Sequence, residues 1–329
     1  MDKKFSLIIC TYMRPQPLLK LLESVRFQTV YPNEILIIDG STNNKTQTIL
    51  QDNSFKCLKY YKVDNANRGL TKQRNFGINR VNDNSEIICF LDDDTVLNPD
   101  YFEELLKTYQ IHPDAFGVGG YIENETNFKY VGYNYKPKIN EFYYDGWKRK
   151  DGSRFVIRKK LGLAPDCSPG FLPSFSHARS ISFLPPSNKI YEVELLMGGV
   201  SSFKKIVFET YQFSTYFEGY GLYEDADFSL RLAKSGKIYL NTAAKLKHYH
   251  EDSGRPNQFN YGLMVVQNGW YVWRVKNPNP SLKDKMKWHA ITVLLIMIRF
   301  SNTLTLSNKK QVFSEAIGRT IGWFKVLIN

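Results

Sequence analysis

The chain has 329 residues, enough for about two packed domains or for one large α/β domain with an extension. Hydrophobic residues make up 43% and charged residues 23%, and these ordinary globular values exclude a disordered chain, a collagen-like repeat and a small disulfide-stapled protein. The net charge of +12 would suit nucleic acid, an anionic membrane surface or a phosphorylated substrate, so the position of the basic residues must decide.

Short apolar runs alternate with helical patterns over the first 110 residues. Strands are expected at residues 6–10, 34–38, 58–63 and 87–91, and helices at 18–27, 46–51, 71–81 and 101–110. The strands are nearly continuous Ile, Leu and Val, as expected of parallel strands covered by helices on both faces. The fold class is therefore α/β, with a Rossmann-like, mostly parallel sheet flanked by helices.

Polar residues follow three of these strands, at positions 11–14, 39–42 and 92–94. Ligands bind such sheets outside the carboxyl ends of the strands, so this edge is the expected site. The run Asp92, Asp93 and Asp94 suits Mg²⁺ or Mn²⁺, which one or two carboxylates hold while leaving room for phosphate oxygens. A turn cap would explain Asp94, but three neighbouring carboxylates repel one another without a cation.

An irregular, aromatic region reaches from residue 117 to about 197. Tyr, Phe and Trp occupy 13 of the 70 positions 121–190, with basic runs at 148–150 and 158–160. Such a segment suits the stacking of sugar rings and the binding of anionic groups, and it suits a second small core equally well. Both interpretations stay open.

Several shorter elements are expected beyond this region. A helical run is predicted at 203–211 and a helix at 224–234, and Gly236 stands where a left-handed cap is expected. A strand at 238–240 and the segment 245–250 follow.

A second acidic motif lies at residues 218–231, where a Gly-rich entry leads into a helix. The helix dipole and an i,i+4 pair between Asp227 and Arg231 explain one carboxylate structurally. They account less well for Glu224 and Asp225 immediately before it. The same dipole keeps a carboxylate ionised, which a general base requires.

The last 60 residues, 270–329, carry most of the net charge. They contain 10 Lys and Arg against Asp284 and Glu315, beside apolar blocks at 290–298 and 323–328. Amphipathic helices of this kind are expected to dock on an anionic membrane surface without spanning it, or equally to pack on the catalytic domain or in a homodimer. Because the basic residues concentrate in an apolar tail, nucleic-acid binding is disfavoured.

The cysteines and the apolar segments predict a cytoplasmic protein without a transmembrane helix. No C-x-x-C pair occurs, and Cys10 and Cys89 lie in strand-like apolar runs, which indicates a reducing compartment. The apolar stretch 5–10 is too short for a signal peptide, and the segment 290–298 is too short for a bilayer span of about 20 residues.

Six motifs follow one another within residues 5–252. They lie at 6–14, 34–41, 67–77, 92–94, 198–204 and 224–225. In this order they resemble the first strand, the second strand, the N-x-G-x-x-x-x-R-N-x-G diphosphate stretch, the D-x-D metal motif, the acceptor loop and the E-D motif of the inverting family-2 glycosyltransferases of GT-A fold. The resemblance implies that fold, with a C-terminal helical extension.

The resemblance implies a nucleoside diphosphate sugar as donor, with a UDP-sugar favoured, and a glycan or lipid-linked acceptor. Gly198 and Gly199 would shape the acceptor site. The second strand ends Asp39-Gly40-Ser41 where many relatives have two consecutive Asp, which leaves the donor sugar and base open. The implied nucleotide-sugar ligands are Thr11, Tyr12, Arg14, Asp39, Asn67, Gly69, Arg74, Asp92 and Asp93.

The D-x-D motif implies Mn²⁺ or Mg²⁺ held by Asp92 and Asp94. A His after the next strand is often a further ligand in the family, and His248 fits best by position. Side chains alternate along an extended segment, so His248 and His250 point to the same side and periodicity does not choose between them.

The E-D motif implies Asp225 as the general base that removes the acceptor proton. Glu224 is its rival, because adjacent residues at a helix start point in different directions and only one can face the acceptor. Glu218 and Asp227 are the remaining candidates nearby.

The predicted activity is metal-dependent transfer of a sugar to an acceptor hydroxyl with inversion, in cell-surface polysaccharide synthesis. A non-catalytic nucleotide-sugar or glycan-binding module is one alternative, and the intact acidic residues at 92–94 and 224–225 argue against it. A sugar-1-phosphate nucleotidyltransferase is another, but no Gly-rich phosphate loop follows the first strand.

Three regions are predicted from these assignments. Residues 1–116 form the nucleotide-sugar-binding half of one domain, and residues 117–252 form its acceptor-binding and catalytic half. Residues 253–329 form the basic, apolar helical extension, which would place the protein at the cytoplasmic face of a membrane.

Overall fold

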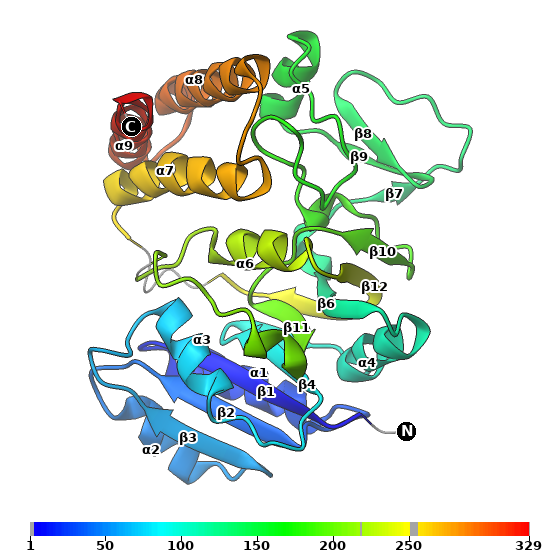
Figure 1. Ribbon diagram of the computed structural model, residues 1–329, viewed down its shortest axis with the longest axis vertical. Helices are drawn as coiled ribbons and strands as arrows, with labels where there is room; N and C mark the ends of the chain where they lie inside the picture. Colours follow the sequence, from blue (N-terminus) through cyan, green and yellow to red (C-terminus); the bar gives the residue numbers. More distant parts are fainter. Residues whose placement is uncertain (1–2, 218, 251–255, 329) are drawn as a thin grey trace. The chain divides into compact units, whose positions relative to one another are not determined.

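The computed structural model describes residues 3–217, 219–250 and 256–328, and the chain divides into two compact units. Unit 1 comprises residues 1–126 and 186–254, and unit 2 comprises residues 127–185 and 255–329 (Figure 1). The aromatic segment after residue 126 therefore belongs to the same unit as the C-terminal helices. The assignment of functions to the three predicted regions stays a prediction. It does not include the packing of residues 127–185 with the C-terminal helices.

Unit 1 is built on a mostly parallel sheet, as predicted. In the described part of the chain its order is β10-β12-β6-β11-β4-β1-β2-β3, with β5 paired to β12. Strands β3, β2, β1 and β4 are parallel, and β11 runs antiparallel to both of its neighbours. The strands are β1 (Phe5–Thr11), β2 (Glu34–Asp39), β3 (Leu58–Lys62), β4 (Ile87–Asp92), β5 (Thr95–Leu97), β6 (Ala115–Ile122), β10 (Ile190–Val193), β11 (Val200–Lys204) and β12 (Lys237–His248).

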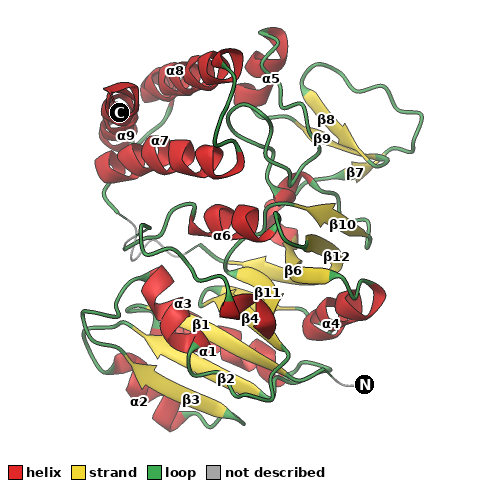
Figure 2. Cartoon of the chain, viewed as in Figure 1, coloured by secondary structure: helices red, strands yellow, loops and turns green. Residues whose placement is uncertain are grey.

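Helices cover this sheet on both faces (Figure 2). Leu7 and Ile9 of β1 belong to the apolar core that also contains the buried side of α1, whereas Ile8 points the other way and contacts Gly77 of α3. Both faces of β1 are therefore buried, which is why its residues Leu7 to Cys10 are continuously apolar. The helices of unit 1 are α1 (Pro15–Arg26), α2 (Lys45–Asp52), α3 (Leu70–Ile78), α4 (Tyr101–Ile111) and α6 (Glu224–Leu232), with 3₁₀ turns η1 (Glu123–Glu125) and η3 (Lys205–Glu209).

The predicted strands and helices of the first 110 residues are confirmed, with ends that shift by a few residues. Two later predictions are wrong. The run 203–211 is not one helix, because Phe203 and Lys204 finish strand β11 and only the following turn is helical. Gly236 is not left-handed; a Cβ there would lie 2.4 Å from the Phe116 ring, so glycine is needed for close packing.

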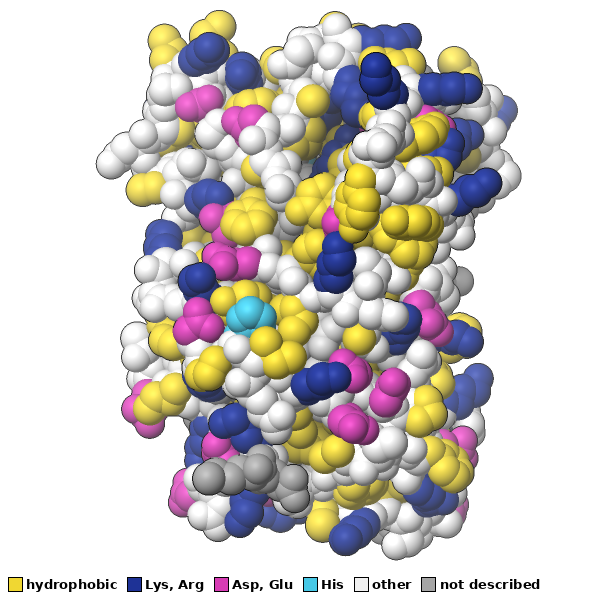
Figure 3. Space-filling view, turned by 90° about the vertical axis from the view of Figure 1, so that its right-hand side faces the viewer, with side chains coloured by type: hydrophobic (Ala, Val, Ile, Leu, Met, Phe, Trp, Pro, Cys, Tyr) yellow, Lys and Arg dark blue, Asp and Glu magenta, His cyan; other side chains and the backbone are white. Residues whose placement is uncertain are grey.

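Unit 2 contains a small antiparallel sheet beside a set of helices. Phe183 lies 5.2 Å from both Phe142 and Phe155 between ring centroids, so the aromatic segment does form a second small core. Tyr130 and Tyr133 are exposed, and in Figure 3, which faces this sheet, hydrophobic side chains lie beside Lys and Arg. The elements are β7 (Lys129–Tyr130), β8 (Glu141–Tyr144), β9 (Trp147–Lys150), α5 (Ser153–Lys160), η2 (Ile181–Phe183), α7 (Gln258–Lys276), α8 (Leu282–Thr305) and α9 (Lys309–Ile328).

Helices α7 and α9 approach each other closely through glycines. A Cβ at Gly262 would overlap the Glu315 carbonyl oxygen, and one at Gly318 would overlap the carbonyl oxygen of Phe259. The backbones therefore touch where larger side chains would hold the helices apart. Across the described residues, none of the helices combines the length and the apolar character that crossing a bilayer requires.

Candidate active site

One arginine joins the two acidic motifs in unit 1. Arg74 of α3 makes an ion pair with Glu224 at the start of α6, and its Nη2 lies 3.6 Å from Asp92 Oδ1 at the end of β4. The side chains of Arg74 and Glu224 are only 3% and 4% exposed, so this pair interacts away from water, whereas the Asp92 side chain is 40% exposed. Arg74 and Glu224, which are 150 positions apart in the sequence, thus lie in one site.

The start of α6 is held in an uncommon backbone conformation. Tyr223, the residue before the helix, is left-handed with φ of +70°, and Gly221 has φ of +72°. A non-glycine residue in this region costs free energy and often marks a functional site. The turn delivers Glu224 and Asp225 as the first two helical residues.

Burial raises the pKa of both acids at this helix start. The pKa of Glu224 rises to about 8, even though Arg74 opposes the rise. Burial also raises the pKa of Asp225, while the backbone N–H groups of Ala226 and Gly198 oppose that rise at 2.7 and 3.2 Å. Perturbed carboxylates of this kind are typical of sites where protons or cations bind.

The two predicted acceptor-loop glycines lie directly against the charged groups. A Cβ at Gly198 would lie 2.5 Å from Arg74 Nη1 and from Glu224 Oε1, and a Cβ at Gly199 would overlap the Asp92 carboxylate. Only glycine lets the backbone pass this close. The structure therefore brings the predicted acceptor loop together with both acidic motifs.

Two residues that were predicted to bind the nucleotide sugar, Thr11 and Arg14, contact the aspartates that follow β4. Thr11 Oγ1 donates to Asp93 Oδ2 at 2.6 Å, and Arg14 Nη1 lies 3.2 Å from Asp93 Oδ1 and 3.3 Å from Asp94 Oδ2. Burial nevertheless raises the pKa of Asp93 to about 7. Thr11 and Arg14 therefore lie at the predicted edge, and their direct contact with a nucleotide stays a prediction.

The aspartates and one histidine form a possible cation site. Asp92, Asp94 and His248 each offer a ligand atom, and these atoms all lie within 4.8 Å of one another. His248 Nε2 is 3.0 Å from Asp94 Oδ1, whereas His250 Nε2 is 2.9 Å from Glu125 Oε1. The geometry favours His248 over His250 as the partner of the D-x-D motif, and the two carboxylates are the ligand type that suits Mn²⁺ or Mg²⁺.

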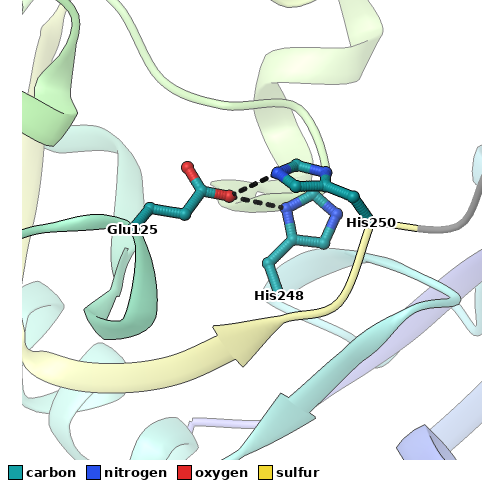
Figure 4. A group of neighbouring side chains, drawn as sticks. All are labelled: Glu125, His248 and His250. Atoms are coloured by element: carbon teal, nitrogen blue, oxygen red, sulfur yellow. Dashed lines mark ion pairs between the residues drawn. The ribbon is translucent and has the colours of Figure 1, made fainter. Parts of the chain in front are cut away.

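Glu125, which lies next to both histidines, was not identified from the sequence. Glu125, His248 and His250 converge on one another (Figure 4), and His248 also contacts Asp94. Glu125 lies in η1 after β6, more than 120 residues before the histidines, and no motif marks it. Only pairing of β12 with β6 brings them together.

Three other residues predicted to bind the nucleotide sugar, Asp39, Tyr12 and Asn67, differ in burial and in hydrogen bonding. Asp39 is fully buried, where Oδ1 accepts from Ser41 N–H and Oδ2 accepts from the Tyr60 hydroxyl, both at 2.8 Å. Tyr12 is 41% exposed, and the Asn67 side chain donates to an Asp64 oxygen at 2.9 Å. Their contact with the donor stays a prediction.

Two further positions at the helix starts have structural explanations. Gly69 has φ of +118° before α3, which glycine tolerates best. Asp227 is buried and pairs with Arg231 Nη2 at 2.7 Å, in the predicted i,i+4 arrangement. Asp227 is therefore engaged as an ion pair, and Glu218 lies outside the described residues.

Comparison with known proteins identifies related sequences. The profile of the family described as "Glycosyl transferase family 2" matches residues 6–176. A glucosyl-dolichyl phosphate glucuronosyltransferase of Haloferax volcanii is 29% identical over 119 residues, which are 36% of this chain and 37% of the relative. The uncharacterized glycosyltransferase YwdF of Bacillus subtilis is 23% identical over 257 residues, 76% of each chain. The chain thus spans well under half of the Haloferax relative.

Solved structures share the fold at low identity. S. aureus TarS 1–349 superposes with a TM-score of 0.53 at 14% identity, over 98% of this chain and 80% of that one. GalNAc-T7, solved with UDP, GalNAc and Mn²⁺, superposes with a TM-score of 0.51 at 15% identity, over 80% of this chain and 48% of that one. At such identities the likeness concerns the fold alone.

Proposed function

The chain belongs to glycosyl transferase family 2, and we propose on that basis that it moves a sugar from a nucleoside diphosphate sugar to an acceptor hydroxyl with inversion at the anomeric carbon. The observation that carries the proposal is the contact of the buried Arg74 side chain with both Glu224 and Asp92. This contact supports a single site that contains both the proposed base motif and the proposed cation motif, as a reaction between a diphosphate leaving group and an attacking hydroxyl requires.

Asp92, Asp94 and His248 are the residues that would hold Mn²⁺ or Mg²⁺. Their ligand atoms are close enough for one ion, and GalNAc-T7 was solved with UDP and Mn²⁺. A bound divalent ion would offset the negative charge of the diphosphate as it leaves. Arg14 would add a second positive charge beside Asp94.

Asp225 is the proposed general base, rather than Glu224. Glu224 is committed to Arg74, whereas each Asp225 oxygen accepts a backbone N–H group and, among the described residues, neither pairs with a cation. These bonds orient the carboxylate. Asp225 would take the acceptor hydroxyl proton as that oxygen bonds to the anomeric carbon. The bond to the diphosphate breaks on the opposite face, which gives inversion.

Calorimetry with UDP, GDP and dTDP tests the donor site. We expect one nucleotide to bind best with Mn²⁺ and to bind more weakly with EDTA, and Asp94→Ala to lose this metal dependence. Transfer assays with the matching nucleotide sugars then separate an enzyme from a binding module. Release of diphosphate from a sugar-1-phosphate and a nucleoside triphosphate would instead indicate the nucleotidyltransferase.

We also propose that the C-terminal helices meet an anionic membrane at its cytoplasmic face, where a lipid-linked acceptor for polysaccharide synthesis would lie. Phe313, Ile321, Phe324 and Ile328 of α9 are exposed and recur at spacings of 8, 3 and 4, so they share one helix face. Lys325 lies on the same helix, in a tail rich in basic residues. Apolar side chains with nearby cations suit an anionic lipid surface.

Vesicle flotation at low salt tests this docking. We expect binding to vesicles that contain phosphatidylglycerol, and loss of binding when Phe313 and Phe324 are both changed to Ser. Phe27→Ser is the matched control, because Phe27 is 73% exposed but lies at the end of α1. Sedimentation that shows a dimer lost in the double variant, without flotation of the unchanged chain, would indicate a homodimer face instead.

A further inference from the structure

The backbone of His248 is clamped by one side chain. Asn124 Nδ2 donates to the His248 carbonyl oxygen at 2.9 Å, and the His248 N–H donates to Asn124 Oδ1 at 3.0 Å. The next N–H, of Tyr249, donates to the Asp94 carbonyl oxygen at 2.9 Å. These bonds fix the position of the histidine backbone relative to β4 and η1, so only rotation of the side chain remains to be set.

The following residue of η1 faces the imidazole ring. Glu125 Oε1 lies 3.3 Å from His248 Nδ1, while Nε2 on the other side of the ring lies 3.0 Å from Asp94 Oδ1 (Figure 4 shows the Glu125 side). The contact with Glu125 is an ion-pair distance without hydrogen-bond alignment. Within the described residues, His248 Nδ1 and Glu125 Oε1 are both buried and make no aligned hydrogen bond.

A histidine that binds a metal through one nitrogen carries its hydrogen on the other. A carboxylate that accepts this hydrogen fixes the tautomer and the ring orientation, and losing it typically costs about 10- to 100-fold in metal affinity. A small rotation of either side chain, each of which is partly buried, would align Glu125 with Nδ1. The lone pair of Nε2 would then face Asp92 and Asp94.

We propose that Glu125 is a positioning residue that accepts the Nδ1 hydrogen of His248 and holds Nε2 toward the cation site of Asp92 and Asp94. This inference rests on the proposed function, because it assumes that His248 is a ligand there. His250, whose side chain is 55% exposed, contacts the same Glu125 oxygen from the outer side and is not a ligand of this cation.

Mn²⁺ binding in the presence of saturating UDP tests the role, measured by calorimetry and by the electron paramagnetic resonance signal of free Mn²⁺. We expect Glu125→Ala to weaken Mn²⁺ by about 10- to 100-fold, and Glu125→Gln to weaken it less, since an amide oxygen still accepts a hydrogen. Glu123→Ala is the matched control, because Glu123 lies in the same turn but faces Lys247 at 3.9 Å. Thermal unfolding without metal checks that each variant is folded.

A double-variant cycle separates positioning from a general structural effect. In a His248→Ala chain, Glu125→Ala should have no further effect on Mn²⁺ affinity, because the residue through which it acts is gone. An equal loss in both backgrounds would overturn the proposal. So would unchanged affinity in Glu125→Ala when the unchanged chain binds Mn²⁺ normally.

Two further results bear on the same proposal. His250→Ala should leave Mn²⁺ affinity within about twofold; loss of a second bound Mn²⁺ in that variant would assign Glu125, His248 and His250 to a separate cation site and overturn the positioning role. Failure of the unchanged chain to bind Mn²⁺ with any nucleotide would overturn the cation site itself, and this proposal with it.

Discussion

Two buried charge clusters, one in each unit, have opposite balances of charge. In unit 2, Asp151 accepts two hydrogen bonds from Arg179 at 2.8 Å and lies 2.9 Å from Lys159. Burial opposes the charge of Asp151, but the bonds from Arg179 and Lys159 outweigh it and lower its pKa. One carboxylate between two cations is satisfied within the protein.

The unit 1 cluster has the reverse balance. Burial raises the pKa values of Asp93, Glu224 and Asp225, and Arg74 and Arg14 do not compensate fully. Glu224 Oε2 is buried and, among the described residues, has no hydrogen-bond partner. In the satisfied cluster, loss of one partner would leave an unpaired buried charge, whereas the surplus of buried acid in unit 1 leaves a site ready for a cation or a proton.

The largest effect is expected at the proposed base. Asp225→Asn keeps the size of the side chain but removes the charge that accepts a proton, so transfer should fall about 10²- to 10⁴-fold while binding of UDP changes little. Steady-state turnover and calorimetry measure the two quantities. Asp227→Asn is the control in the same helical turn and should keep turnover per folded molecule. Normal turnover in Asp225→Asn with loss in Glu224→Gln would reverse the two roles.

Breaking the satisfied cluster should instead cost stability. Arg179→Met removes both bonds to Asp151, and leaving a buried charge underpaired typically costs about 3–5 kcal/mol. Urea unfolding should show this loss, with the Mn²⁺ affinity of the folded chain unchanged. Lys205→Met, which removes a surface pair with Asp83, should have little effect on unfolding. A stable Arg179→Met chain would contradict the structural role of the cluster.

Two glycine substitutions sharpen the same contrast. Gly199→Ala would push the Asp92 carboxylate and should weaken Mn²⁺ by about tenfold. Gly318→Ala would push α9 from the Phe259 carbonyl and should lower the free energy of unfolding by about 1–3 kcal/mol without changing Mn²⁺ affinity. Gly152→Ala is the control, because a Cβ there meets no atom within 4 Å. If Gly199→Ala, Gly318→Ala and Gly152→Ala changed the free energy of unfolding equally, the distinction between a glycine needed for binding and one needed for packing would be wrong.

Changes of pH are expected to act with opposite signs in the two clusters. The lowered pKa of Asp151 stabilises the folded state above the ordinary value of 3.8, and this stabilisation is lost as pH falls through the lowered value. The raised pKa of Glu224 does the reverse, because the folded chain grows less stable as pH rises from 4.5 to about 8. Urea unfolding of Asp151→Asn and Glu224→Gln across pH 3 to 9, without metal, should remove these two dependences separately.

The sequence by itself determined the alternating strands and helices of the first 110 residues. It also determined the acidic residues at the end of β4 and at the start of α6. Helix and strand periods arise from neighbours a few positions apart, so they can be read without knowing the fold. Asp92, Asp94 and Asp225 are predicted as site residues from local motifs and from the resemblance, because each lies in a compact motif.

Only the tertiary structure decided which distant side chains share a site. Arg74 meets Glu224 because α3 and the start of α6 lie close together, and Glu125 meets His248 because β12 pairs with β6. It also decided that residues 127–185 pack with the C-terminal helices. Such contacts depend on where the chain returns after a hundred or more residues, and a single sequence carries no local period that records this return.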